Sequence, residues 1–224
     1  MVGVRRAARG YRKLNYGRTL NYARQVSEGV CAVRYGRERK QATRRRIIET
    51  AGRRFKADGI DGSGIAALMA DAGLTNGAFY AHFDSKDDLV ASAVADQLRE
   101  QCETLGAAVP GHAGVEQILR TYLSVQHRDS PERGCPSAAL LDEIARCADS
   151  TRRAYTDGVL AVIDDVAARV APHDPQSARV QTFSIYALMV GTLQLSRALV
   201  DQQLADVVLE QGIQSALTLL GTDE

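Results

Sequence analysis

The feature that most constrains this chain is a helical hydrophobic pattern that glycines interrupt from residue 40 onward. Ile48, Ala51 and Phe55 recur at positions i, i+3 and i+7, with charged residues on the opposite face. This spacing predicts an amphipathic helix. We expect the helix to end at Asp58-Gly59, because glycine readily adopts the left-handed conformation that ends many helices.

Two shorter helices joined by a tight turn are expected next. Ser63 is predicted to cap the first of them, because a serine hydroxyl accepts from the free N–H groups at a helix start. Gly73 is expected to end it, and Thr75 to cap the second, which carries Phe79, Tyr80 and Phe83. Two short helices separated by a turn containing glycine are typical of a helix-turn-helix.

The rest of the chain also has helical periodicity. The expected helices span approximately residues 85–106, 112–128, 136–148, 151–171, 175–200 and 203–220. No segment shows the alternation and closely spaced turn signals of β-strands. We therefore predict an all-α protein, with an N-terminal three-helix helix-turn-helix domain over residues 40–86 and a helical domain over residues 87–224.

Charge is distributed unevenly along the chain. The net charge is +8 over residues 1–39, +3 over residues 40–86 and −10 over residues 87–224, although the total is only +1. A basic front and an acidic rear indicate that the front meets a polyanion.

Residues 1–39 show no sustained hydrophobic period. One interpretation is a disordered basic extension, in which arginines could enter a DNA minor groove. The other is a misassigned start, with translation beginning near Val33.

Membrane insertion and secretion are not expected. The longest uncharged stretch, Val180 to Ser196, has 17 residues and several polar ones, fewer than the roughly 20 apolar residues that cross a bilayer. The N-terminus lacks the apolar region of a signal peptide. The four cysteines have no CxxC spacing, which fits free thiols in a reducing cytoplasm.

The segment 46–90 resembles the DNA-binding domain of the TetR family of bacterial transcriptional regulators. The resemblance is carried by Gly73 to Phe83, with Gly77, Tyr80 and His82, and then by Lys86. It covers about a fifth of the chain. Ala66 departs from the family pattern, since members often carry a longer polar or basic residue there, and its presence shifts the expected base contacts to the third helix.

A recognition helix enters the major groove only when its exposed face carries small or polar residues. Asn76 is the best candidate for base contact, because its amide can pair with adenine. Tyr80, His82 and Lys86 are expected to contact phosphates. The full predicted DNA-binding set is Arg45, Ser63, Thr75, Asn76, Gly77, Ala78, Tyr80, His82 and Lys86.

The resemblance implies a ligand-responsive regulator, most often a repressor, that binds a near-palindromic operator as a homodimer. An activator is the alternative output. The last two helices are the most apolar, which is typical of either a core or a dimer interface. Because Gly191 permits close approach, we expect the dimer to form through residues 175–220. The effector is a small molecule of unknown identity, and no membrane partner is expected.

The family fold implies an effector pocket among the rear helices. Its candidate residues are the few aromatic and polar groups on apolar stripes: Tyr122, His127, Cys135, Tyr155, Phe183, Tyr186, Met189 and Gln194. Cys135 precedes Pro136 at a predicted helix start and follows Arg133, so a low-pKa thiol that senses oxidants or electrophiles is a further hypothesis. A disulfide with Cys147, about 18 Å away along the helix, is not expected.

Catalysis is not expected. The chain has no GxSxG, no HExxH and no GxGxxG after a strand, and its four histidines are scattered. No cofactor and no metal site are predicted. A nonspecific nucleic-acid protein driven by the basic front is the remaining alternative, and it would bind without sequence preference and with steep salt dependence.

Overall fold

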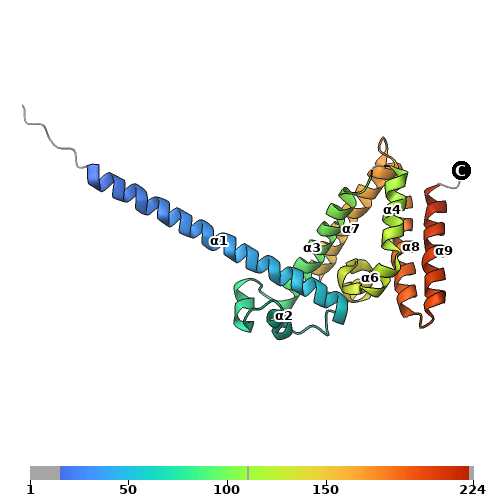
Figure 1. The fold of residues 1–224 in the computed structure, drawn as a ribbon, viewed down its shortest axis with the longest axis horizontal. Coiled ribbons are helices and arrows are strands. Elements are labelled where there is room, and N and C mark those ends of the chain that lie inside the picture. Colours follow the sequence, from blue (N-terminus) through green and yellow to red (C-terminus); the bar gives the residue numbers. More distant parts are fainter. Residues whose placement is uncertain (1–15, 110, 222–224) are drawn as a thin grey trace, which may run out of the picture. The chain divides into compact units, whose positions relative to one another are not determined.

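The computed structural model describes residues 16–109 and 111–221, with backbone alone for residues 16–36. Every regular element in these residues is a helix, as predicted (Figure 1). The elements are α1 (Tyr16–Asp58), α2 (Ile65–Asp71), η1 (Asn76–Ala81), α3 (Lys86–Gly106), α4 (His112–Tyr122), α5 (Val125–Asp129), η2 (Pro131–Arg133), α6 (Pro136–Arg146), α7 (Asp149–Val170), α8 (Pro175–Ala198) and α9 (Gln202–Leu220).

Residues 1–43 and residues 44–224 form two separate compact units. In the first unit, residues 16–43 are continuously helical. The sequence analysis placed the helix start near Lys40, and this boundary is corrected to Tyr16. The helix prediction relied on an apolar stripe, so a stretch without one was missed. The expectations for residues 1–15 lie outside the described residues.

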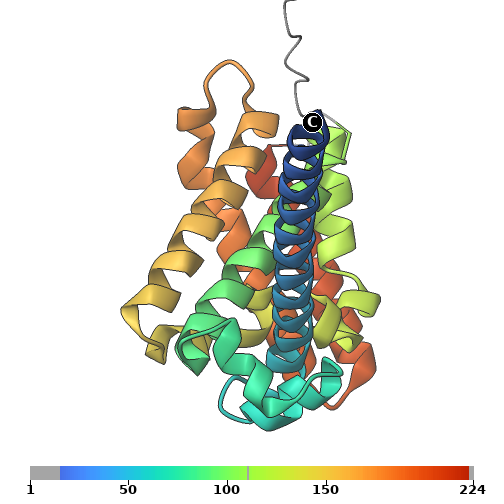
Figure 2. The same cartoon turned by 90° about the vertical axis from the view of Figure 1, so that its left-hand side faces the viewer.

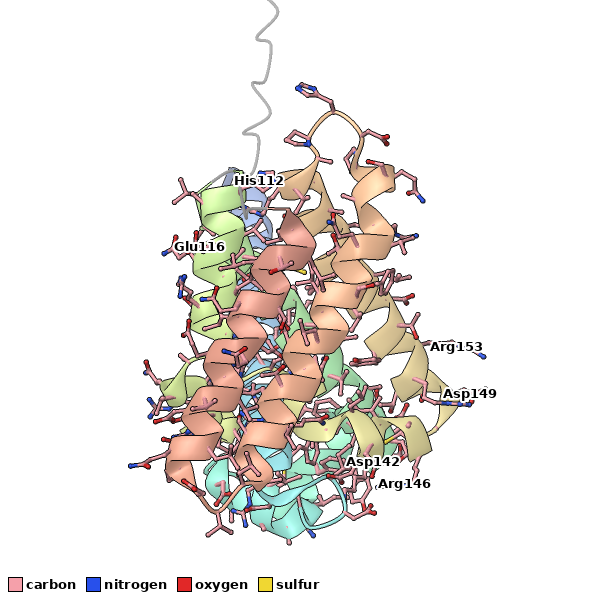
Figure 3. All side chains as sticks on the ribbon, turned by 90° about the vertical axis from the view of Figure 1, so that its right-hand side faces the viewer. His112, Glu116, Asp142, Arg146, Asp149 and Arg153 are labelled. Atoms are coloured by element: carbon pink, nitrogen blue, oxygen red, sulfur yellow. The ribbon has the colours of Figure 1, made fainter. Side chains whose placement is uncertain are left out.

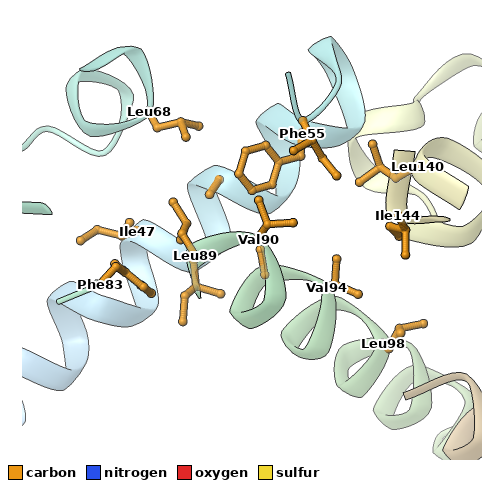
Figure 4. Packing of buried hydrophobic residues seen from close by; sticks show 14 of the residues in the cluster. Ile47, Phe55, Leu68, Phe83, Leu89, Val90, Val94, Leu98, Leu140 and Ile144 are labelled. Atoms are coloured by element: carbon orange, nitrogen blue, oxygen red, sulfur yellow. The ribbon is translucent and has the colours of Figure 1, made fainter. Parts of the chain in front are cut away.

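We call residues 44–85 the head. Its core is formed by large apolar side chains from α1, α2, η1 and the segment after η1: Phe55, Leu68, Met69, Phe79 and Phe83 are all at most 2% exposed. Leu89 and Val90 from the start of α3 complete this core (Figure 4). The head therefore shares one hydrophobic core with the helix that follows it.

Two glycines shape the head because their backbone lies in the left-handed region. Gly59 has φ +80° at the end of α1, and Gly73 has φ +65° after α2. A side chain at either position would be strained. The sequence analysis placed the ends of these two helices correctly.

The remaining helices form a bundle. α3 packs along α7, α7 packs against α8, and α8 packs against α9 (Figures 1 and 2). α8 and α9 pack closely at Gly212, where a Cβ atom would lie 2.5 Å from the Thr192 methyl group. Gly191, which was expected to allow close packing, is exposed. A Cβ atom at this position would have no neighbour within 4 Å in the described part of the chain.

Most predicted helix bounds in the bundle agree with the structure within three residues. The expected helix 112–128 is an exception, because it divides into α4 and α5. The Ser124 hydroxyl accepts from the His127 N–H at 3.2 Å and so starts a new helix. Over the described residues, none of the helices is long and apolar enough to cross a membrane.

Candidate functional site

The helix-turn-helix is formed by α2, η1 and the turn between them. Gly73 N donates to Ala70 O at 2.9 Å, and Leu74 N donates to Met69 O at 2.8 Å. η1 is held to the head by Phe79, whose ring is fully buried and stacks on Phe83 with 5.7 Å between centroids. Because both anchoring rings point inward, the opposite face of η1 is presented to solvent.

The exposed face of η1 carries the small and polar residues that were predicted to contact DNA. Thr75, Asn76 and Gly77 are exposed, and Tyr80 is 68% exposed. Ala78 is half-buried and packs against the head core. η1 is a 3₁₀-helix rather than the expected α-helix, and Thr75 precedes it without a side-chain capping bond.

The structure contradicts the role predicted for Ser63. This residue is fully buried, and its hydroxyl donates to Gly59 O at 2.8 Å. The N-cap of α2 is Gly64, not Ser63. Ser63 therefore stabilises the turn between α1 and α2 and is not available for contact with DNA.

Three cationic or polar residues flank the exposed face. Arg45 is 72% exposed and pairs with Glu49 at 3.6 Å. Lys86 and His82 are half-buried. Lys86 lies in the first turn of α3, which Ser85 caps by accepting from Asp88 N at 3.1 Å, as the sequence predicted.

Two arginines hold the head in place. Arg44 donates to the Ser92 hydroxyl at 3.0 Å, and its guanidinium lies over the Phe83 ring at 4.6 Å. Arg54 bridges Asp58 and Asp71, each at 2.5 Å, and these carboxylates raise its pKa. Arg54 thereby links α1 to α2 and fixes the orientation of the helix-turn-helix.

A cavity of about 640 Å³ lies beneath the head. It is bounded by α3, α4, the segment from α5 to the start of α6, and the last turn of α1. Its lining is rich in amides and hydroxyls: Gln97, Gln101, Thr104, Gln117, Thr121, Tyr122, Ser124, Gln126 and Ser130. Leu105, Ile118 and Pro136 supply apolar surface.

The predicted effector residues divide into three groups. Tyr122, His127 and Cys135 line the cavity. Tyr155 and Tyr186 do not line the cavity, but hydrogen bonds connect them to Cys135. Phe183, Met189 and Gln194 do not line the cavity, which corrects their assignment: Phe183 is 39% exposed, Met189 belongs to the core between α8 and α9, and Gln194 is exposed.

Hydroxyl groups connect the cavity wall to the bundle. Tyr155 donates to the Ser137 hydroxyl at 3.0 Å, and Ser137 lies 2.7 Å from the Tyr186 hydroxyl. Tyr186 lies 3.7 Å from the Cys135 thiol, which donates to Gln101 Oε1 at 3.3 Å. One consistent assignment has each group donating to the next, from Tyr155 to Gln101. Burial raises the pKa of both tyrosines, so they remain neutral donors.

His127 holds the start of α6 in place. Its Nε2 accepts from Cys135 N at 3.0 Å, so its Nδ1 carries the proton that is donated to Tyr122 O at 2.7 Å. Burial lowers the pKa of His127, and the nearby Arg197 and Lys56 lower it further. The imidazole is thus held neutral with both nitrogens bound to backbone.

Lys56 is a cavity residue that the sequence analysis missed. It lies in the last turn of α1 and donates to Gly134 O at 2.7 Å. Burial lowers its pKa. The sequence feature that could have identified Lys56 is its position eight residues after Ile48, which places a cation on the apolar face of the helix.

The outer surface of α8 and α9 carries several exposed large hydrophobic side chains among polar ones. Figure 3 shows these two helices side by side, facing the viewer. The large hydrophobic residues exposed on them are Val180, Phe183, Leu195, Leu204, Val207 and Leu219. Single exposed apolar residues are ordinary, but several on two adjacent helices mark an interaction surface.

Sequence and structure comparisons converge on one class of protein. Residues 47–93 match the family described as bacterial regulatory proteins, TetR family. The chain is 41% identical over 86 residues to the HTH-type transcriptional regulator TtgR of Pseudomonas putida, a match that covers 38% of this chain and 40% of TtgR. The aligned part of the chain thus spans well under half the length of this curated relative.

The likeness in fold extends further. The reduced form of NemR from E. coli superposes with a TM-score of 0.64 at 18% identity, covering 79% of this chain and 96% of NemR. A TetR-family regulator from Cytophaga hutchinsonii gives 0.64 at 20% identity, covering 82% of this chain and 96% of that regulator.

These comparisons and the geometry define an all-α fold with a helix-turn-helix and a helical second part. The match to the TetR family covers residues 47–93, and the similarity to TetR-family structures extends over the fold.

Proposed function

We propose that this protein is a DNA-binding transcriptional regulator that reads a near-palindromic operator through η1. The observation that carries the proposal is the exposed face of η1, where Thr75, Asn76 and Tyr80 stand out from a head whose Phe79 and Phe83 are buried. Asn76 is assigned to base contact, and Tyr80, His82, Arg45 and Lys86 to phosphates.

The protein acts as a homodimer in this proposal. One short helix contacts too few base pairs for genomic specificity, so such proteins pair two copies on a two-fold site. The exposed apolar residues of α8 and α9 supply the surface, and the open space beside Gly191 permits a second copy to approach α8 closely.

The proposed output is repression that a small-molecule effector relieves. An effector in the cavity changes DNA affinity only if it binds two conformations of the head unequally. The cavity is suited to this because its wall includes Lys56 of α1, the helix that also contributes Phe55 to the head core. Because the target is DNA, we expect the protein to act in the cytoplasm.

Thiol sensing through Cys135 is a second candidate function, because this thiol lines the cavity and takes part in the hydroxyl network. A Cys135→Ser variant separates the two functions. A variant that still responds to a non-reactive effector excludes a requirement for the thiol, whereas loss of response to electrophiles alone supports sensing.

A footprint on the DNA that flanks the coding region tests the main proposal. We expect the wild-type chain to protect a near-palindromic site. The double variant Asn76→Ala, Tyr80→Phe should lose that footprint, and Thr156→Ala, an exposed polar change on α7, should retain it. A footprint that persists in the double variant would show that the recognition surface is assigned wrongly.

A further inference from the structure

Three polar groups on the cavity wall have unused hydrogen-bonding capacity. The Tyr122 hydroxyl belongs to a side chain that is only 8% exposed, and among the described residues it has no well-formed hydrogen bond, only a weak interaction with the Cys135 thiol. Gln97 Oε1 is likewise buried without a partner in the described part of the chain. Both residues line the cavity. A buried polar atom left unpaired is costly, so such atoms point to a ligand or bound solvent that completes them.

Lys56 adds a charge to this wall. An ammonium group has three N–H donors, and the structure shows one of them bound to Gly134 O. Within residues 16–109 and 111–221, no protein acceptor is seen for the other two. Lys56 donates to Gly134 O, and His127 joins the next residue to Tyr122, because it accepts from Cys135 N at 3.0 Å and donates to Tyr122 O at 2.7 Å. These contacts place Lys56 and Tyr122 at the same end of the cavity.

The charged residues that line the cavity have a net positive charge, and the other lining residues are partly polar and partly apolar. Lys56 and Arg133 are cationic, Glu100 is the single carboxylate, and His127 is held neutral by its two backbone bonds. Leu105 and Ile118 line the cavity from α3 and α4. A ligand that pairs with Lys56 and Tyr122 needs an acceptor with negative charge and an apolar body, while Gln97 Oε1, itself an acceptor, is left to bound solvent.

We propose that the effector cavity takes an organic carboxylate with an apolar aromatic or aliphatic body, held by Lys56 and Tyr122. This inference rests on the proposed function only in using the same cavity as the effector site. The carboxylate oxygens accept from the Lys56 ammonium and the Tyr122 hydroxyl, and the body lies against Leu105 and Ile118.

The preference for an anion over a neutral acceptor has a physical cause. Burial penalises the charged form of Lys56 and lowers its pKa. A carboxylate beside the ammonium offsets that penalty and forms a charge-assisted hydrogen bond, which is roughly twice as strong as a neutral one. A carboxamide of the same shape gives only a neutral bond, and an amine brings a second positive charge.

Calorimetric titration of the full chain without DNA tests the ligand class. The probes are 2-naphthoate, its neutral match 2-naphthamide, its cationic match 2-naphthylmethylamine, and octanoate as an aliphatic carboxylate. We expect a carboxylate to bind at least about tenfold more tightly than the amide, and the amine to bind most weakly. Equal binding of 2-naphthoate and 2-naphthamide would overturn the proposal, as would failure of both carboxylates to bind.

Two variants test the residues. Lys56→Met should weaken 2-naphthoate binding about tenfold or more and leave amide binding nearly unchanged, and Tyr122→Phe should weaken it about threefold to tenfold. Arg153→Met is the matched control, because Arg153 is an 80% exposed cation on α7 (Figure 3) and is not among the residues that line the cavity. If Lys56→Met folds poorly, Lys56→Gln gives the same comparison.

Equal loss in the control, or unchanged carboxylate binding in both variants, contradicts the assignment. These titrations contain no DNA, so the two tests are independent. A failed titration would contradict the ligand proposal and not the operator footprint, and a failed footprint would contradict the DNA-binding proposal and not the titrations.

Discussion

At the residue scale, Tyr122 gives an unusual prediction about stability. Its buried hydroxyl has no well-formed hydrogen bond among the described residues, only a weak interaction with the Cys135 thiol, so removing it relieves a desolvation penalty and breaks little bonding. We expect Tyr122→Phe to leave the free energy of unfolding unchanged or to raise it by up to about 1 kcal/mol. Chemical denaturation of the ligand-free protein measures this. A loss of more than about 1 kcal/mol would show that the hydroxyl has a partner in solution.

His127 predicts how stability depends on pH. Its folded pKa lies below its unfolded value, so the unfolded chain binds the proton more readily. Its contribution to stability is therefore complete above the unfolded pKa of about 6.5 and is lost as the pH falls from there toward the lower folded pKa.

Thermal unfolding between about pH 7.5 and pH 5.5 tests this contribution. We expect the melting temperature of the wild type to fall more over this range than that of His127→Gln, whose amide oxygen can still accept from Cys135 N. Parallel curves for the two proteins would mean that His127 does not titrate differently in the folded and unfolded chains.

At the scale of elements, α6 links the cavity to the head at two places. Lys56 donates to Gly134 O just before α6, and the Glu143 carboxylate on α6 accepts from Ile60 N at 2.7 Å. Ile60 is only 6% exposed. A displacement of α6 therefore disturbs the turn between α1 and α2, next to the helix-turn-helix.

Glu143 tests this connection. We expect Glu143→Ala to destabilise the protein by about 1–2 kcal/mol, because Ile60 N loses its acceptor in a buried position. Glu143→Gln should cost less, since its amide oxygen can still accept. Asp142→Ala is the control, because Asp142 is 85% exposed, pairs with Arg146 on the same helix and should change stability by less than about 0.5 kcal/mol (Figure 3). Equal effects at the two positions would contradict a linking role for Glu143.

The sequence was a good guide to elements whose apolar stripe faces a core. The stripe through Ile48, Ala51 and Phe55 and the glycines after α1 and α2 are where they were predicted. The sequence failed where a residue type has two competing local roles. Ser63 has the chemistry of an N-cap, yet its hydroxyl bonds backward to Gly59 O, and Gly64 takes the cap position.

The cavity could be predicted only in part. Tyr122, His127 and Cys135 were assigned to it and do line it. Lys56 was missed because a cation in the head helix gave no indication that α1 reaches the second domain. Phe183, Met189 and Gln194 were misplaced, because an aromatic or polar residue on an apolar stripe can face a core, a partner or a cavity. Only the packing of α8 against its neighbours decides between these.

At the scale of the whole molecule, the apolar surface of α8 and α9 predicts self-association. Val207 and Leu195 are 56% and 54% exposed. We expect the double variant Leu195→Asp, Val207→Asp to shift the protein from dimer to monomer and to abolish operator binding, because buried unpaired charges oppose association. Analytical ultracentrifugation measures the mass. The control is Val125→Asp, an apolar-to-acid change at a 46% exposed site on α5, and it should remain dimeric. The assignment of this surface would be contradicted if the Val125 variant were monomeric or if the double variant remained a dimer.

The central claim is that η1 distinguishes one DNA sequence from another. Its most direct test is the ratio of affinities for the footprinted site and for a scrambled duplex of equal length, measured at one salt concentration without effector. We predict that Asn76→Ala lowers this ratio roughly 5- to 150-fold, which corresponds to about 1–3 kcal/mol of binding free energy. The affinity for the scrambled duplex should stay nearly constant. An unchanged ratio, or a wild-type protein that binds both duplexes equally, would contradict the claim.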